Sequence, residues 1–201
     1  MLTAFIAIVS LVCVADAGAV PTKADPFAQY LEKHELPGPT AELNGLGPKP
    51  EAAFMRLAND EAAPTPIRAR AMAALRNLPS PQVQAFVAKW VEIHAETVIP
   101  AERVVLRRAA MVLGWLGGPA MVDRLALLFE NDDADVRMDA VLALGLSRAP
   151  RAAGILRKRQ DKEPEEHIRQ QIQRVLLSLD APTGPPEGPP PRKTRPLRTE
   201  F

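Results

Sequence analysis

One apolar pattern recurs four times along this chain. Its apolar or small side chains are spaced so that they share one face of an α-helix. Successive copies begin 38, 31 and 32 residues apart, which suits a helix–turn–helix unit that stacks on its neighbours to bury its apolar face. The pattern therefore predicts an all-α array of helical hairpins. The copies are Ile67-Ala71-Ala74-Leu75-Leu78, Val105-Ala109-Val112-Leu113-Leu116, Val136-Ala140-Ala143-Leu144-Ser147 and Ile168-Ile172-Val175-Leu176-Leu179.

Prolines mark where these helices are expected to begin. The missing N–H of proline costs nothing in the first helical turn, and its fixed backbone angle suits helix entry. The best-formed unit has a first helix over 105–116, a break at Gly117-Gly118 and a second helix from Pro119. The stretch 131–135 supplies Asn and Asp side chains that are expected to cap the next helix. Helices are expected at or just after Pro66, Pro81, Pro100, Pro119, Pro150 and Pro164.

The N-terminal stretch is interpreted as a signal peptide covering residues 1–19. Residues 4–15 are apolar and uncharged, and small residues suitable for cleavage follow. This run is shorter than the roughly 20 residues of a membrane-spanning helix, so export to the periplasm or the cell exterior is expected. Lipoprotein anchoring at Cys13 is the minor alternative, because Val12 stands where a small residue is required. Cys13 is the sole cysteine, so a mature chain would have no disulfide.

Residues 20–60 are expected to form an N-terminal extension with two capping helices. Asp25 and Pro26 open the first helix, and Phe54 lies in the second. The proline- and glycine-rich stretch 36–50 between them is expected to be a loop.

The regular array is expected to occupy residues 61–180. Residues 181–201 are rich in proline and carry several basic residues, so they are expected to form a disordered tail. The basic residues of this tail suggest contact with a membrane surface.

Residues 133–145 carry the most specific motif of the chain. An acid, then Val136-Arg137, then Ala140, then Ala143-Leu144-Gly145 follow one another in this order. The order resembles that of HEAT repeats, in particular the short bacterial kind also found in bilin lyase subunits. The unit at Ile67 has Arg76 in place of the glycine, and the unit at Val105 shifts its arginine to Arg107.

The resemblance covers roughly residues 61–180, and its motifs report packing rather than chemistry. It implies an α-solenoid, a right-handed superhelix of helical hairpins whose second helices line the concave side. In HEAT repeats the arginine after the apolar residue pairs with acids of the preceding loop and forms a ladder. By this resemblance Arg68, Arg137 and Arg169 are structural, whereas the alternative role is to line an anion site.

The sequence offers no catalytic or metal-binding spacing. His34, His94 and His167 lie far apart, with neither an HExxH motif nor a cysteine partner. Glu92 and Glu96 flank His94, but residues two apart on a helix point in different directions. We therefore expect no enzymatic activity, no cofactor and no metal. The formal net charge of +1 selects no partner.

Two tryptophans and one basic stretch are the other candidate features. Trp90 continues the apolar stripe of its helix and is expected in the core, whereas Trp115 lies beside its stripe and is expected to be partly exposed. The alternative is that they form a stacking platform for a base, sugar or bilin. Residues 148–162 hold six basic residues against one acid, and the glutamates just beyond are expected to neutralise them. The alternative is a basic patch that grips an acidic partner.

The leading hypothesis is a non-catalytic scaffold that binds a protein through a concave face built from the second helices. An alternative, which rests on the resemblance alone, is a lyase-like protein that handles a bilin or haem. A further alternative is nucleic-acid binding through Trp115 and the basic stretch, which export disfavours. The candidate contacts lie off the apolar stripes and are Lys89, Glu92, Asp123, Arg124, Arg157 and Lys158.

Overall fold

The computed structural model describes residues 25–35 and 37–180, and this part of the chain is helical without any strand. The predicted signal peptide and the predicted tail lie outside the described residues. The α-helices are α1 (Pro26–Lys33), α2 (Thr40–Gly45), α3 (Pro50–Asn59), α4 (Thr65–Ala74), α5 (Pro81–His94), α6 (Pro100–Leu116), α7 (Pro119–Leu127), α8 (Ala134–Ser147), α9 (Ala152–Gln160) and α10 (Glu166–Asp180). Short 3-10 turns, η1 (Leu75–Asn77) and η2 (Leu128–Glu130), follow α4 and α7.

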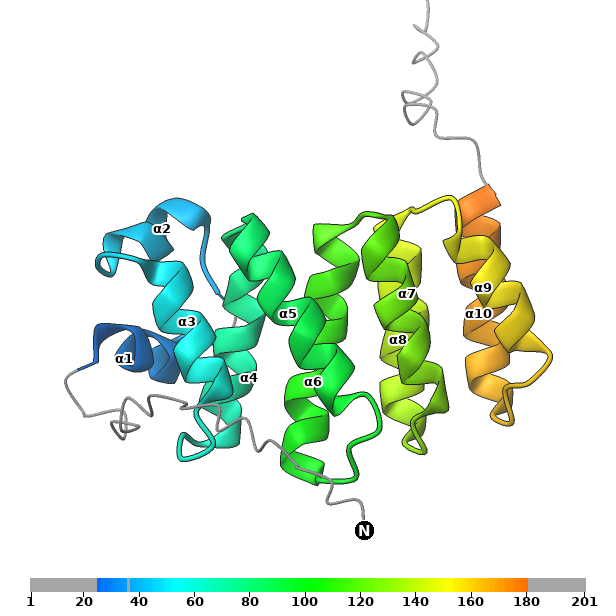
Figure 1. The fold of residues 1–201 in the computed structure, drawn as a ribbon, viewed down its shortest axis with the longest axis horizontal. Helices are drawn as coiled ribbons and strands as arrows, with labels where there is room; N and C mark the ends of the chain where they lie inside the picture. Colours follow the sequence, from blue (N-terminus) through cyan, green and yellow to red (C-terminus); the bar gives the residue numbers. More distant parts are fainter. Residues whose placement is uncertain (1–24, 36, 181–201) are drawn as a thin grey trace, which may run out of the picture.

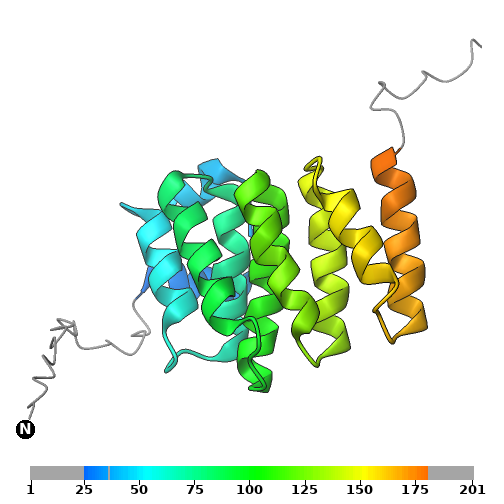
Figure 2. The same cartoon turned by 45° about the vertical axis from the view of Figure 1, so that its right-hand side comes forward.

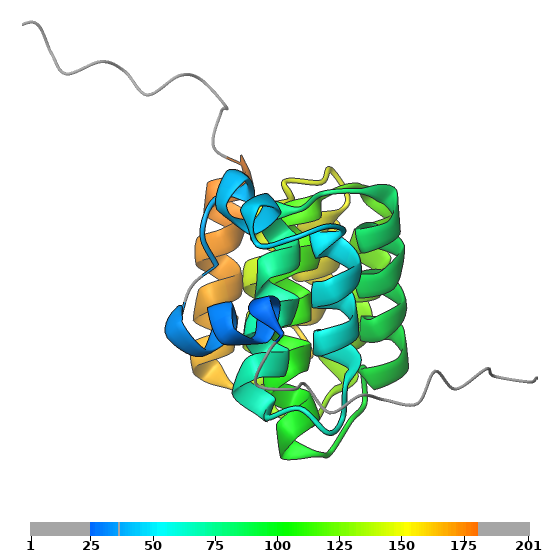
Figure 3. The same cartoon turned by 90° about the vertical axis from the view of Figure 1, so that its left-hand side faces the viewer.

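The helices form two layers that run side by side along the array (Figure 1). We call α4, α6, α8 and α10, which carry the recurring pattern, the motif layer. The helices α3, α5, α7 and α9 form the second layer, which faces the viewer in Figure 1. Figures 2 and 3 show the same stack after rotation, with α10 and α3 at opposite ends of the array. This arrangement is the α-solenoid that the repeat pattern predicts.

Local capping explains where the helices begin. The Asp25 carboxylate accepts hydrogen bonds from the backbone N–H groups of Phe27 and Ala28 at the start of α1. The Ser80 hydroxyl caps α5 in the same way, and Asp133 caps α8. Such side chains satisfy backbone donors that have no partner within the helix. Proline occupies the first turn of α4, α5, α6 and α7, and it precedes α9 and α10 by two residues, as predicted.

The core lies between the two layers. The recurring apolar positions of the motif helices are almost all buried, and they pack against apolar side chains of the second layer such as Val87, Leu125 and Leu156. Trp90 is also in the core, with 3% of its surface exposed, as predicted. Burial of this apolar surface is the main force that holds successive units together.

The motif helices approach one another closely at two glycines. A Cβ atom on Gly114 of α6 would lie 2.6 Å from the carbonyl oxygen of Ala143 in α8, so only glycine fits there. A Cβ atom on Gly145 would lie 2.8 Å from a methyl carbon of Val175 in α10. In the second layer, by contrast, α5 and α7 touch over a smaller region, and α7 and α9 are barely in contact.

The closer layer of a two-layer stack lies on the inside of its curve. The motif layer is therefore the concave side, and the prediction that the second helices line it is wrong. The physical reason is the size of the side chains at the contacts. Gly114 and Gly145 permit close backbone approach between successive motif helices, whereas successive second-layer helices touch over a smaller region.

The stretch 36–50, predicted as a loop, contains one short helix. Leu43 of α2 is fully buried, and the Thr40 hydroxyl donates a hydrogen bond to the carbonyl of Asn77, so this turn is fastened to the array. Within the described residues, no helix combines the length and apolarity that crossing a membrane requires.

Candidate binding groove

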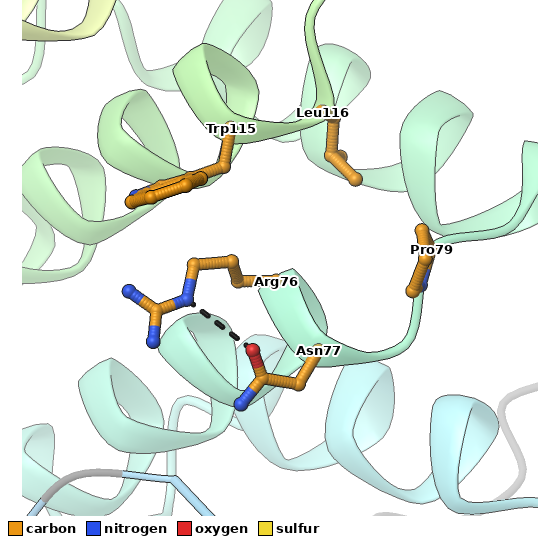
Figure 4. Close-up of a pocket in the computed structure, with 5 residues that line it drawn as sticks. All are labelled: Arg76, Asn77, Pro79, Trp115 and Leu116. Atoms are coloured by element: carbon orange, nitrogen blue, oxygen red, sulfur yellow. Dashed lines mark hydrogen bonds between the residues drawn. The ribbon is translucent and has the colours of Figure 1, made fainter. Parts of the chain in front are cut away.

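Trp115 stands at the C-terminal end of α6 with 56% of its surface exposed. The guanidinium carbon of Arg76 lies 5.2 Å from the centre of the Trp115 ring, in the geometry of a cation–π contact. Arg76 Nε also donates a hydrogen bond of 3.3 Å to Oδ1 of Asn77. Figure 4 shows the two side chains facing each other across a cavity that Pro79 and Leu116 close on the other side.

Three cavities of the described surface meet at Trp115, and together we call them the Trp115 groove. The cavity in Figure 4 has a volume of about 420 Å³. A second, of about 130 Å³, lies between α4 and α6 and shares Arg76 and Trp115 with the first. A third, of about 550 Å³, crosses from α6 over α8 to α10. Its lining residues are Met111, Trp115, Leu142, Gly145, Leu146, Arg148, Val175 and Ser178.

The groove combines an apolar floor with basic side chains. Met111, Leu142 and Val175 supply apolar surface, and Leu146 is 38% exposed beside them. Arg76, Arg108 and Arg148 are exposed and line one or more of the three cavities, and no carboxylate lines any of them. Concave sites with an apolar lining and a few polar groups are the usual form of binding sites.

A second cluster of charges lies at the opposite, N-terminal ends of the motif helices. The Arg68 guanidinium binds both carboxylate oxygens of Glu102, at 2.7 and 2.9 Å, and donates to the carbonyl of Ala58. Arg137 binds Glu163 at 3.0 Å and donates to the carbonyls of Asn131 and Asp132. Both arginines are buried, so each pair links one unit of the stack to the next.

These contacts form a ladder, but its acids differ from the prediction. Glu102 and Glu163 lie beyond the helix of their arginine, whereas the preceding segment contributes backbone carbonyls, of Ala58 at the end of α3 and of Asn131 before α8. Arg169 lies on α10, the last helix of the described residues, and its guanidinium binds Glu166 of its own helix and the carbonyls of Glu163 and Pro164.

Arg103 completes the ladder in the second of the four motif-bearing units and was missed in the sequence. It donates to the carbonyl of Thr97 at 3.0 Å and pairs with Asp132 and Asp133. Arg107, which the sequence motif suggested for this role, instead binds Asp135 and Asp139 of α8. Arg103 lies one helical turn before Arg107, and its side chain makes the ladder contacts. A motif with fixed spacing does not include this position, so the sequence pattern did not indicate it.

Glu163 is the most buried acid of the ladder. Burial raises the pKa of its carboxyl, but hydrogen bonds from Arg137 and Arg159 outweigh this, so the pKa lies below the ordinary glutamate value. The backbone N–H of Glu165 also donates to this carboxylate. Glu163 therefore stays ionised inside the stack at neutral pH.

The comparison with protein families agrees with this architecture. Residues 100–176, which span α6 to the last turns of α10, match the model of HEAT repeats. This part of the chain contains HEAT repeats. A search of curated proteins finds no match.

The fold places the sequence-predicted contact residues on the second layer, away from the groove. Several of them pair among themselves or with neighbours: Lys89 with Glu92 at 3.6 Å, Asp123 with Arg151 at 3.0 Å and Arg157 with Asp180 at 3.0 Å. Lys158 is exposed on α9, and Arg124 is partly buried on α7. The structure therefore spreads Lys89, Glu92, Asp123, Arg124, Arg157 and Lys158 over three helices without joining them into one of the cavities described.

Two of the three histidines, His34 and His94, have packing roles. His94 stacks on Trp90 with ring centres 3.8 Å apart, donates a hydrogen bond from Nδ1 to the Trp90 carbonyl, and lies 3.8 Å from Glu102. His34 stacks on Tyr30 in the same way. Among the described residues, no three His, Cys, Asp or Glu side chains are placed to hold a metal ion.

Proposed function

We propose that this helical-repeat scaffold is non-catalytic and binds a protein partner through the Trp115 groove. The observation that carries the proposal is the exposure of Trp115 on the concave side, where the groove crosses the motif helices. Tryptophan and arginine are the residues most enriched among those that dominate protein–protein binding energy. A half-exposed tryptophan beside aliphatic side chains and arginines is typical of such a centre.

The opposite, second-layer face has fewer features of a binding surface. Its charged residues are largely paired with one another, and exposed pairs of this kind contribute little binding energy. The Trp115 groove instead offers exposed arginines with no carboxylate in its lining.

We also propose that the protein is exported, and that the partner belongs to the bacterial envelope or the extracellular space. Support for this part comes from the sequence alone, from the apolar residues 4–15 followed by small residues at a suitable cleavage position.

Capture from native envelope extract tests the binding function. The tagged full-length chain is compared with a Trp115→Ala variant and with Lys158→Glu, a matched surface change on the second layer. The proposal expects the unmodified chain and Lys158→Glu to retain the same protein and Trp115→Ala to lose it. Loss with Lys158→Glu alone would place binding on the second layer and contradict the groove. Circular dichroism and thermal unfolding of all three chains verify that each is folded.

A further inference from the structure

The arginines of the Trp115 groove differ from most other arginines of the chain in how they are paired. The arginines of the ladder, and Arg107, Arg151, Arg157 and Arg159 elsewhere, each form an ion pair with a carboxylate. Arg76, Arg108 and Arg148 line the groove, and none of them forms an ion pair with a described residue. The groove therefore holds a surplus of positive charge that the described part of the protein does not neutralise.

Apolar surface lies between these charges. Met111, Leu142, Leu146 and Val175 line the largest cavity, and Trp115 separates it from the cavities around Arg76. A ligand that fills this cavity gains from burying apolar groups, at about 25 cal/mol per Å² of apolar surface. A ligand made only of charged groups would lose hydration against these aliphatic side chains without a compensating partner.

We infer that the Trp115 groove binds an acidic segment of a partner protein that also carries apolar side chains. The inference rests on the proposed function and names the chemistry of its partner. The carboxylates of the segment pair with Arg76, Arg108 and Arg148, and its apolar side chains enter the cavity between α6, α8 and α10. Arg76 is held over Trp115, so part of the cost of ordering this arginine is met before binding.

The length of the groove sets the size of the segment. Packed helices lie about 8–10 Å apart, so the three steps from α4 to α10 span roughly 25–30 Å. An extended chain covers this distance with about eight or nine residues, since each residue advances roughly 3.3 Å.

Two other occupants fit less well. The chain's own residues 181–201 carry Arg192, Lys193, Arg195 and Arg198 against two glutamates, so they repel the groove arginines. A nucleic acid would place a phosphate backbone against the aliphatic lining, and it would meet one exposed aromatic ring rather than a series of stacking platforms.

Selection from a phage-displayed random dodecapeptide library against the full-length chain tests the inference. We expect the enriched peptides to contain Asp or Glu together with Leu, Ile, Phe or Trp. Labelled copies of these peptides are then titrated against three variants. Arg108→Glu/Arg148→Glu and Trp115→Ala should each weaken the Kd about tenfold or more, whereas Lys158→Glu should leave it unchanged. The affinity of the unmodified chain should fall as salt concentration rises, because salt screens the charge pairs.

The outcomes separate the inference from the proposed function. Peptides that are not acidic but are lost with Trp115→Ala would overturn the inference and leave the groove as the binding site. Peptides that bind all variants equally would overturn both. The inference would also be overturned if the library yields no enriched peptide. The same holds if a single-stranded oligonucleotide displaces the selected peptides at a lower concentration than unlabelled copies of those peptides.

Discussion

Arg76 of η1 lies over Trp115 of α6, at a position where the first unit departs from the repeat pattern. In α6 and α8 the equivalent residues are Gly114 and Gly145, which let the next motif helix come close. Arg76 replaces that glycine, and its guanidinium carbon sits 5.2 Å from the ring of Trp115 on the next helix. Arg76 lines two of the three cavities of the groove, so the residue that breaks the repeat pattern is part of the candidate site.

The two tryptophans should report these environments separately. A Trp90→Phe variant retains Trp115 alone, which is 56% exposed, and we expect long-wavelength emission and strong quenching by iodide. A Trp115→Phe variant retains Trp90, which is 3% exposed, and should emit at shorter wavelength with weak quenching. Equal quenching of the two variants would contradict the placement of Trp115. Steady-state fluorescence with an iodide titration makes this measurement.

The close approach of α6 and α8 predicts a contrast between two glycines. Gly114→Ala should destabilise the fold by about 1–3 kcal/mol, because its Cβ would meet backbone atoms of Ala143 that cannot move away easily. Gly154→Ala is the control, since no atom lies within 4 Å of its Cβ position in α9. That change should stabilise the protein by roughly 0.5–1 kcal/mol through helix propensity. Urea unfolding measures both, and equal effects would argue against the tight contact.

The sequence predicts the helical layers well because the pattern that sets them is local. Proline in the first turn, acidic caps and the spacing of Ala140, Ala143 and Leu144 all act within one helix or one hairpin. The curvature of the stack depends instead on which layer packs more closely. That depends on contacts between helices, such as Gly114 against Ala143, which the sequence of one helix does not show.

The groove was predicted only in part, for the same reason. The position of Trp115 beside its apolar stripe indicates exposure, but nothing in one helix shows that Arg76, Arg148 and Val175 converge on it from three others. The ladder acids were misplaced because Glu102 and Glu163 lie many residues beyond their arginines.

The buried ladder predicts a large effect at Arg137. Replacing Arg137 by Met leaves the buried carboxylate of Glu163 with fewer partners, which should cost about 3–5 kcal/mol of the free energy of unfolding. Arg157→Met is the matched control, because its pair with Asp180 is more than half exposed. That change should cost about 1 kcal/mol or less. Chemical unfolding compares the two, and similar losses would mean that Arg137 is not a buried structural residue.

The lowered pKa of Glu163 predicts how the free energy of unfolding depends on pH. Its pKa is lower in the folded chain than in the unfolded chain, so the unfolded state binds more protons between the two values, and stability rises with pH there. The contribution of Glu163 is therefore present above the ordinary glutamate pKa of about 4.3 and is lost as pH falls through the lowered value.

A Glu163→Gln variant isolates this contribution. It should be less stable than the unmodified chain at neutral pH, and the difference should shrink as the pH is lowered below about 4, where the carboxyl becomes protonated. Urea unfolding of both chains at a series of pH values gives the difference directly. A gap that stays constant, or widens in acid, would contradict an ionised Glu163 in the fold.

Site-specific photocrosslinking tests the proposed binding face most directly. A benzophenone amino acid is placed at Leu146 in the Trp115 groove, and in a second chain at Lys158 on the second layer. Both chains are illuminated in native envelope extract, and the adducts are analysed by mass spectrometry. The account predicts a partner adduct from position 146 that Trp115→Ala abolishes and no such adduct from position 158. An adduct from position 158 alone would contradict it.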